Sequence, residues 1–203
     1  MKVLIACEYS GIVREAFAKL GHNAWSCDIL PTEIPGNHYQ CDVMEVLDLD
    51  WDLMIAHPPC TYLSKAGARW MFQPAGVLNQ ERYHKALKAK EFFLKLLNAP
   101  IDKICIENPM PLKIVELPLQ TQIIQPYEYG NPFSKKTYLW LKNLDPLIPT
   151  KILKDYQPYL PSNTGFGKRK GQKFQYKSIT SKESAKTFQG IADAMASQWG
   201  WTL

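Results

Sequence analysis

Short apolar segments alternate with helical patterns along the first half of the chain. Four segments are mainly apolar along their length and do not alternate between apolar and polar residues: 2–8, 23–29, 51–56 and 103–106. Strands that are buried on both faces have this pattern, and strands separated by helices are typical of a parallel sheet. The pattern therefore predicts an α/β fold with a mainly parallel central sheet and helices on both faces.

Three segments repeat apolar residues at a spacing of three to four, as amphipathic helices do. The first ends at Gly21, in the position of a C-cap. The second spans residues 80–97, and the third begins at Ser181, where Thr180 and Glu183 have capping-box spacing. The apolar faces are expected to carry Val13, Phe17 and Leu20 in the first helix, Tyr83, Leu87, Leu94 and Leu97 in the second, and Phe188, Ile191, Met195 and Trp199 in the third.

A region of different composition precedes the last helix. Residues 122–126 and 136–141 predict two more strands, but residues 143–180 contain frequent prolines and scattered aromatic residues, with a basic tripeptide at 168–170. We expect an irregular basic insert there. The length of the chain favours a single domain that spans residues 1–203 and includes the insert.

The composition limits the class of protein. Hydrophobic residues make up 46% and charged residues 21% of the chain, which is ordinary for a soluble globular domain and excludes a disordered chain. Five cysteines without framework spacing indicate a reducing compartment, and the absence of a long apolar run favours a cytoplasmic protein. No group of His and Cys residues has zinc-site spacing, so no metal is expected. The net charge of +5 permits a nucleic-acid partner.

Residues with chemical capacity follow several of the predicted strands. In an open parallel sheet, ligands bind beyond the carboxyl ends of the strands. At these ends the chain has a turn leading into a helix, whose N-terminus could receive an anionic group, and then two aspartates, a cysteine and a glutamate. The residues are Glu8, Tyr9, Ser10 and Gly11 in the turn, followed by Asp28, Asp42, Cys60 and Glu107.

One cysteine is a candidate nucleophile. Cys60 follows a rigid Pro-Pro turn at a strand end, whereas Cys7, Cys27 and Cys105 lie within apolar strands and are expected to be inert core thiols. A nucleophilic thiol requires a stabilised thiolate, which a nearby cation or a helix N-terminus would provide. The position of Cys60 is suited to presenting such a thiol to a pocket.

The order of these residues resembles that of the motifs of the cytosine-C5 DNA methyltransferases, over nearly the whole chain. The turn at residues 8–12 is similar to the family's first motif, which contacts S-adenosylmethionine. Asp28 lies where the ribose-binding acid would be, and Asp42 where an acid would face the adenine amino group. Residues 189–195 are similar to the last motif, which completes the cofactor pocket. The resemblance implies S-adenosylmethionine as cofactor, bound by Glu8, Tyr9, Ser10, Gly11, Asp28, Asp42, Pro58 and Asp193.

The same resemblance implies a catalytic set. Cys60 matches the nucleophile of the family's Pro-Cys pair, and Glu107 matches the glutamate of its Glu-Asn pair, which holds the target base. Residues 129–137 are similar to a basic motif that contains two arginines in the family. The implied fold is the Rossmann-like methyltransferase fold, and the implied reaction is methylation of cytosine C5 in DNA through a covalent cysteine adduct. The implied catalytic residues are Cys60, Glu107, Asn108, Lys135 and Thr137.

The chain departs from the family pattern at several positions. Val13 replaces a second glycine of the first motif, and His57 and Pro58 stand where Gly and Phe usually precede the Pro-Cys pair. The short insert at 143–180 replaces a large target-recognition domain, although its basic residues 168–170 could hold phosphates. The resemblance is therefore to a short form of the kind associated with phages and restriction-modification. Its substrate would be duplex or single-stranded DNA, with a homodimer or a recognition partner as further options.

Three other interpretations of the same residues stay open. Enzymes that methylate an exocyclic amine use an Asp/Asn/Ser-Pro-Pro-aromatic tetrapeptide, of which residues 57–60 share the two prolines. Methylation of C5 in a free pyrimidine nucleotide or a single-stranded nucleic acid would suit the short insert, and salt-sensitive DNA binding would separate it from duplex methylation. A methyltransferase-like protein that only binds nucleic acid is the third, and the intact Cys60 and Glu107 argue against it.

Overall fold

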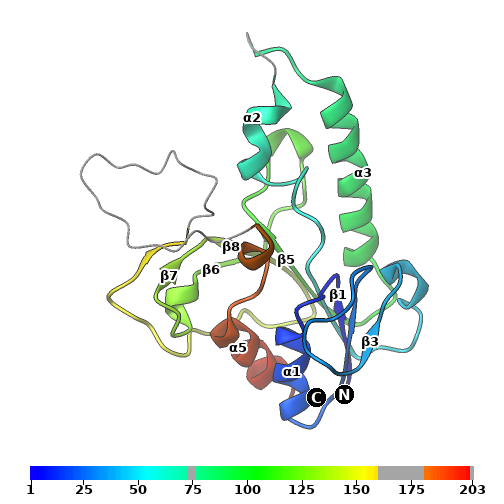
Figure 1. Ribbon diagram of the computed structural model, residues 1–203, viewed down its shortest axis with the longest axis vertical. Helices are drawn as coiled ribbons and strands as arrows, with labels where there is room; N and C mark the ends of the chain where they lie inside the picture. The colour runs from blue at the N-terminus through cyan, green and yellow to red at the C-terminus, as the bar shows by residue number, and fades with distance from the viewer. Residues whose placement is uncertain (73–75, 160–180, 202–203) are drawn as a thin grey trace.

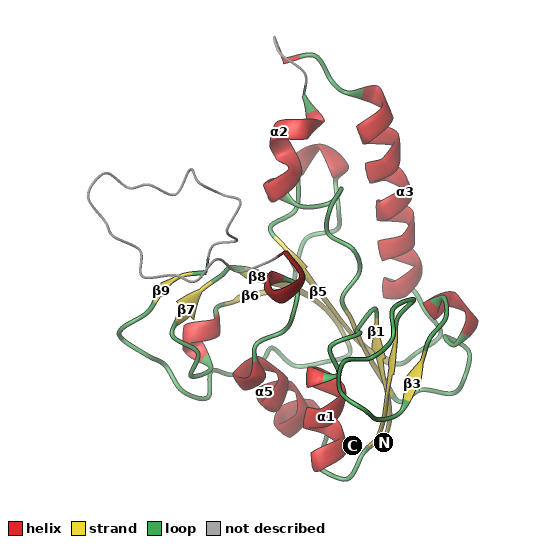
Figure 2. Ribbon diagram, viewed as in Figure 1, coloured by secondary structure: helices red, strands yellow, loops and turns green. Residues whose placement is uncertain are grey.

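A seven-stranded sheet forms the centre of the structure, a computed structural model that describes residues 1–72, 76–159 and 181–201. The strand order is β3-β2-β1-β4-β5-β8-β6 (Figures 1 and 2). Strands β1 to β5 pair in parallel, whereas β8 runs antiparallel to both β5 and β6. This topology confirms the predicted class, an α/β fold of Rossmann-like type with a mainly parallel central sheet and helices on both faces.

The sheet strands have the following bounds: β1 (Lys2–Ala6), β2 (Asn23–Cys27), β3 (His38–Tyr39), β4 (Leu53–Ala56), β5 (Lys103–Pro109), β6 (Gln122–Ile124) and β8 (Thr137–Lys142). A separate pair joins β7 (Phe133–Ser134) and β9 (Gln157–Pro158). The helices are α1 (Ile12–Lys19), α2 (Ala68–Met71), α3 (Gln80–Leu97), α4 (Ser181–Ser184) and α5 (Gln189–Trp199). In the described residues, 3₁₀ turns lie at Val43–Glu45, Lys65–Gly67, Lys113–Val115 and Pro126–Glu128.

Helices cover both faces of the sheet, as the sequence predicts. On one face α1 and α5 pack together, and Phe17 and Met195 from these helices share a buried cluster with Ile5 of β1. On the other face α3 contributes Phe93 to a cluster that contains Leu4 of β1. Adjacent strand residues point to opposite faces, so Leu4 and Ile5 explain why β1 is apolar throughout.

The predicted helix faces are correct in part. The bounds of α3 are those predicted, but its buried face lies one residue earlier in the sequence than the predicted face. Leu87 is therefore 39% exposed. The buried residues of α3 are Ala86, Phe93 and Leu96. Leu20 is also exposed, because α1 has ended before it and the chain turns at Gly21, whose φ is 84°.

The C-terminal helical region is two helices rather than one. Ile191, Met195 and Trp199 form the predicted buried stripe of α5. Phe188 precedes that helix in an extended conformation (φ −71°, ψ 138°), which separates α5 from the short α4. Thr180 of the predicted capping box lies outside the described residues.

The remaining differences concern short elements. The two-residue strand β3 was not predicted, since no apolar run marks it, and β4 begins at Leu53 rather than at residue 51. Within the described part of the predicted insert, residues 143–159, the structure has no helix, and β9 is its strand. The basic residues 168–170 lie outside the described residues. None of the helices in the described part of the chain combines the length and apolarity that crossing a membrane requires.

Candidate functional site

Four neighbouring strands bring two predicted site residues, Asp28 and Glu107, into one row with two others at the carboxyl edge of the sheet. Across β2, β1, β4 and β5 the last residues in parallel register are Cys27, Ala6, Ala56 and Ile106. The next residue on each strand forms what we call the edge row: Asp28, Cys7, His57 and Glu107. Neighbouring strands lie about 4.8 Å apart, so side chains in the edge row are within reach of their neighbours.

The carboxylate of Glu107 is held by two side chains at one of its oxygens. Nδ1 of His57 lies 3.2 Å from Oε2 of Glu107, and the hydroxyl of Thr187 donates to the same oxygen at 3.1 Å. The side chains of His57 and Glu107 are each 14% exposed. The residue predicted to hold a target base is thus fixed in place by its neighbours.

His57 and Glu107 each shift the pKa of the other. Burial by itself lowers the pKa of His57, but the hydrogen bond and charge of Glu107, with the charge of Glu8, outweigh burial and raise it. Burial by itself raises the pKa of Glu107, but His57, Lys135 and Thr187 together lower it. Between the two pKa values the pair is an imidazolium–carboxylate ion pair.

Cys60 opens a tight turn after β4. Its carbonyl oxygen accepts backbone hydrogen bonds from Leu63 at 3.1 Å and Ser64 at 2.9 Å, and the residue is half-buried. Burial raises the pKa of the thiol, and the positive charge of Lys135 opposes that rise. The thiol therefore rests in its protonated form at neutral pH, and Lys135 is the cation that favours its thiolate.

Three other predicted residues hold the backbone around the site. Nζ of Lys135 donates to the carbonyl of Ser184 at 2.7 Å. Thr137 is buried, and its hydroxyl donates to the carbonyl of Lys135 at 3.2 Å. Asn108 is also buried, and its Nδ2 donates to the carbonyl of the buried Pro58 at 3.1 Å. Thr137 and Asn108 thus fix the main chain beside Lys135 and ahead of the cysteine.

The N-terminus of α1 is occupied by a side chain of the protein itself. The carboxylate of Glu8 accepts hydrogen bonds from the backbone of Val13 at 2.8 Å and Arg14 at 3.2 Å, and from the hydroxyl of Ser10 at 3.0 Å. Glu8 and Ser10 are both buried. A carboxylate at this end of a helix is favoured by the helix dipole. The structure thereby corrects the expectation that an anionic ligand binds there, because Glu8 already takes the free donors.

A buried arginine supports the same turn. Arg14 is 1% exposed, and its guanidinium group donates hydrogen bonds to Glu15 Oε1 (3.0 Å), Ser26 Oγ (3.0 Å), Thr32 Oγ1 (3.2 Å) and the carbonyl of Ile34 (2.6 Å). Gly11 has a φ of 76°, and a Cβ at Gly11 would lie 2.8 Å from Nη2 of Arg14. The turn therefore requires glycine, and Arg14 ties it to the loop at residues 28–37.

The three aspartates predicted to contact the cofactor lie in different settings. Asp28 and Asp42 are close to the end of β1, since the charge of each raises the pKa of the Cys7 thiol, for which burial is the larger cause. The side chain of each also accepts a hydrogen bond from the backbone two residues ahead, at 2.9 and 3.0 Å. Asp193 lies on the exposed face of α5 and accepts a hydrogen bond from Gln189 at 2.8 Å.

A segment from the C-terminal region covers the edge row. Residues 181–187, which include α4, lie in front of the carboxyl ends of the central strands (Figure 1). The hydroxyl of Tyr9 donates to the carbonyl of Lys182 at 2.9 Å. The ammonium groups of Lys182 and Lys186 pair with the carboxylate of Glu33 at 2.8 and 2.5 Å. With Thr187 on Glu107, these contacts attach the segment at both ends.

A small cavity remains between this covering segment and the edge row. It has a volume of about 20 Å³, which is room for little more than one water molecule. Its lining residues are Cys7, Glu8, Tyr9, Ser10, His57, Ala185, Lys186 and Thr187. Nε2 of His57 is buried and has no hydrogen-bond partner among the described residues.

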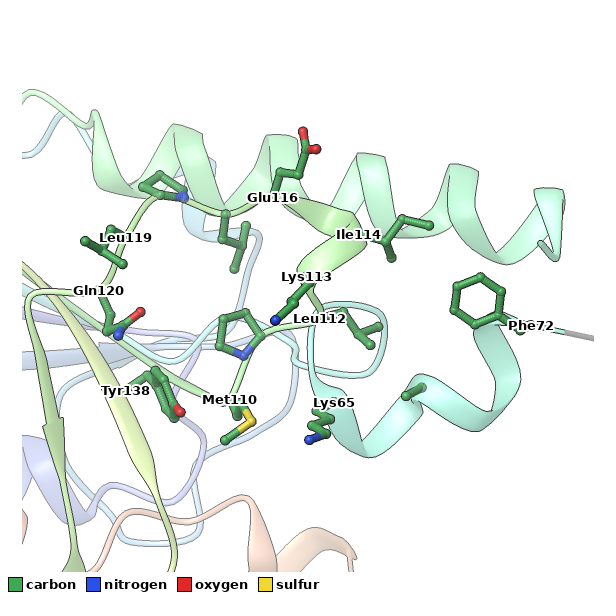
Figure 3. A pocket seen from close by; sticks show the side chains of 14 residues that line it. Lys65, Phe72, Met110, Leu112, Lys113, Ile114, Glu116, Leu119, Gln120 and Tyr138 are labelled. Atoms are coloured by element: carbon green, nitrogen blue, oxygen red, sulfur yellow. The ribbon is translucent and has the colours of Figure 1, made fainter. Parts of the chain in front are cut away.

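A larger cavity lies away from the edge row, between α2 and the loop that follows β5. It has a volume of about 690 Å³, and none of the predicted site residues lines it. Figure 3 shows Met110 and Leu112 on the loop side and Tyr138 on β8, with Lys65 and Phe72 at the side of α2. No group of three or more His, Cys, Asp or Glu residues in the described part of the chain is arranged to hold a metal ion.

Some residues of the site had no role in the sequence analysis. His57 departs from the motif of the resembled family, yet strand register alone places it beside Glu107, since both follow aligned strand ends. Arg14 had the pattern of an exposed helix residue. Thr187 and Glu33 act over long sequence separations, 80 residues for Thr187 and Glu107, and no local pattern marks them.

The chain resembles a solved structure at low sequence identity. No family model matches the sequence, and no curated protein matches it. Among solved structures, the chain is similar to the crystal structure of an E. coli protein provisionally named a DNA modification methyltransferase encoded within a prophage, with 15% sequence identity and a TM-score of 0.46. The match covers 74% of this chain and 51% of that chain, so this chain spans about half the length of that protein.

Proposed function

We propose that the chain is an S-adenosylmethionine-dependent methyltransferase that methylates C5 of cytosine in DNA, with Cys60 as the nucleophile. The observation that carries the proposal is that Cys60 follows β4 and Glu107 lies on the neighbouring β5 at one edge of a mainly parallel sheet, near enough to Lys135 for its charge to act on both. The charge of Lys135 acts on the pKa of both other groups. A thiolate can add to a pyrimidine ring, and a carboxylate can stabilise the adduct that forms. An ammonium group nearby favours the thiolate over the thiol.

The reaction requires a nucleophile because C5 of cytosine does not attack a methyl donor by itself. The thiolate of Cys60 forms a bond to C6, and the electron pair of the C5–C6 double bond moves into the ring, which makes C5 nucleophilic. Glu107 binds N3 and the exocyclic amine and stabilises this adduct. After methyl transfer, solvent water takes the proton from C5, the C5–C6 double bond re-forms, and the S–C6 bond breaks to release Cys60 as its thiolate.

Residues in and beside the edge row would hold S-adenosylmethionine as cofactor, which supplies the methyl group from its sulfonium when bound. Asp28 would hold the ribose hydroxyls and Asp42 the adenine amino group. The unpartnered Nε2 of His57 lies at the same cavity and gives a bound molecule a polar contact. The present cavity of about 20 Å³ is too small for the cofactor, so the covering segment 181–187 would move away as it binds.

DNA is the proposed substrate because C5 methylation needs a cytosine and the chain has a net charge of +5. Lys135 and Lys136 stand before β8 at the edge where the base would enter, and could contact phosphates. Access to a base in a duplex requires flipping it out of the stack, at a cost of a few kcal/mol. A single-stranded substrate avoids that cost, and the chain could read a duplex as a homodimer or with a recognition partner.

The test is transfer of labelled methyl groups from S-adenosylmethionine to duplex and single-stranded DNA, with Cys60→Ser compared with wild type. A matched control is Cys41→Ser, which changes a half-buried thiol that contacts Cys27 instead. The expected result is label in 5-methylcytosine that Cys60→Ser abolishes and Cys41→Ser retains. Label on an exocyclic amine would replace the C5 assignment by amino-methylation. Label in free pyrimidine nucleotides but not in DNA would change the substrate.

A further inference from the structure

We infer that His57 is a positioning residue that delivers, through Glu107, the proton that cytosine N3 takes up when Cys60 adds to C6. This inference rests on the proposed function and assigns a role to a residue at which the chain departs from the family pattern. It concerns the source of the proton, whereas Cys60 and Glu107 are the groups that touch the base.

The geometry of the pair carries the inference. His57 and Glu107 occupy the same level on adjacent strands, because Ala56 and Ile106 are in register. Nδ1 of His57 lies 3.2 Å from Oε2 of Glu107, and both side chains are 14% exposed. Nε2 of His57 is buried without a partner in the described residues. Among those residues, the imidazole therefore has one polar contact, between Nδ1 and the carboxylate of Glu107. A proton on Nδ1 therefore has a short path to Glu107.

The charges around His57 decide whether it carries that proton. Glu107 on β5 and Glu8 after β1 favour the imidazolium, while Lys135 before β8 disfavours it. Lys186 of the covering segment lines the same small cavity. The two carboxylates outweigh the cation and the burial, because the net effect on His57 is a raised pKa.

The remaining titratable groups at this cavity are thiol and phenol groups. Cys7 and Tyr9 line it, and the pKa of each is raised, mainly by burial. Both groups are therefore neutral at neutral pH and leave the balance of charge around His57 unchanged.

The proton transfer balances in both directions. As the S–C6 bond forms, an electron pair moves from the C5–C6 double bond through C4 onto N3. N3 takes a proton from Glu107, and Glu107 takes one from Nδ1 of His57, so the site ends with neutral imidazole and a carboxylate. When the S–C6 bond breaks, N3 returns its proton to Glu107 and His57 is recharged.

The test is the pH dependence of kcat/KM for DNA methylation, from about pH 6 to 9, in wild type and His57→Gln. Wild type needs both the thiolate of Cys60 and the imidazolium of His57. Between the pKa of His57 and the pKa of Cys60, the thiolate fraction rises with pH as the imidazolium fraction falls, so the rate of wild type is level there. Without the imidazole, the rate of His57→Gln continues to rise about tenfold per pH unit over the same range. At pH 7 we expect kcat to be about 10²-fold lower in the variant, with KM for DNA little changed.

Thr187→Val is the matched control, because it removes the other hydrogen bond to the same oxygen of Glu107 and no proton. It is expected to leave the shape of the pH profile unchanged. A His57→Gln profile that keeps the level region overturns the inference and leaves the proposed function intact. If wild type methylates no cytosine at any pH, the proposed function fails and the inference fails with it.

The pH dependence of stability gives a second measurement that needs no turnover. The pKa of His57 is raised, so its contribution is complete below the unfolded value of 6.5 and is lost as pH rises through the folded value. The pKa of Glu107 is lowered, so its contribution is complete above 4.5 and is lost as pH falls through the folded value. Both contributions are complete between pH 4.5 and pH 6.5. The stability difference between wild type and His57→Gln should therefore be largest in that range. A difference that does not vary with pH overturns the charged pair and with it the proton source.

Discussion

Replacing Arg14 by methionine tests whether one buried guanidinium holds the candidate cofactor turn. Methionine keeps the apolar stem of the side chain but removes all of the hydrogen bonds that the guanidinium group donates. Those bonds join α1 to the end of β2 and to the loop at residues 28–37, which carries Glu33. The loop in turn holds the covering segment, so the substitution acts on the scaffold of the site without touching the edge row.

The expected loss of stability follows from the acceptors that remain. A hydrogen bond to a charged group contributes about 1.5–3 kcal/mol net. The hydroxyl of Ser26 keeps a contact with His38 at 2.8 Å, and the carbonyl of Ile34 keeps a bond from Thr32 at 2.9 Å, so neither is left without a partner. Methionine also avoids the cost of burying a charge. We therefore expect the free energy of unfolding to fall by about 2–4 kcal/mol, less than the sum of the bonds.

The assay is urea unfolding and thermal melting of wild type, Arg14→Met and the control Glu15→Gln. For a chain of this size the loss corresponds to a decrease in Tm of about 5–15 °C. Glu15 is 31% exposed and pairs with Arg14 at 3.0 Å, so its substitution should cost under about 1 kcal/mol. Hydrogen exchange should show the added opening concentrated at residues 28–37. A loss below about 1 kcal/mol for Arg14→Met, or protection of that loop equal to wild type, would refute the reasoning.

Three further predictions concern packing, thiol reactivity and the covering segment. Gly190→Ala should lower the free energy of unfolding by about 3 kcal/mol, because a Cβ there would lie 1.8 Å from a backbone carbonyl oxygen. In the control Gly21→Ala the Cβ meets nothing within 4 Å, so the loss should be about 1 kcal/mol, from the positive φ alone. Equal losses for the two variants in urea unfolding would contradict this. The raised pKa of Cys60 should make its alkylation by iodoacetamide at pH 8 slower than that of the same cysteine in urea, and Lys135→Ala should slow it further in the folded chain; mass spectrometry of the modified peptide measures both. Glu33→Gln removes the partner of two lysines in the covering segment, so trypsin should cleave at 181–187 faster than in wild type, with unchanged cleavage as the contrary result.

The fold was predictable because its signals are local. The strand cores are continuous apolar runs, and α3 follows a spacing that its sequence carries over its whole length. The sheet edge was predictable as well, since parallel topology alone places the residues after β1, β4 and β5 together. His57 and Glu107 meet for that reason, and aligning the strand ends would have found the pair without any structure.

The parts that the sequence did not indicate depend on contacts between distant segments. Arg14 follows Val13 in α1 as any exposed charged residue would, and its burial depends on acceptors contributed by residues 26–34. Glu8 has the position of a ligand-binding acid, but its carboxylate is used by the helix that follows. A carboxylate can cap a helix or face a ligand from the same place in the sequence, and its hydrogen-bond partners decide between the two.

The covering segment connects cofactor entry with the arrangement of the proposed catalytic groups. Thr187 donates to Glu107, and Ser184 accepts from Lys135, so the segment that closes the small cavity also holds two of the charged groups at the site. Movement of the segment to admit a cofactor would break both contacts together. Glu107 would then have an acceptor site open for the base, and the ammonium group of Lys135 would be released from its carbonyl partner. The same displacement that makes room for a methyl donor would thus free the groups proposed to act on the cytosine, because both are held by one short stretch of chain.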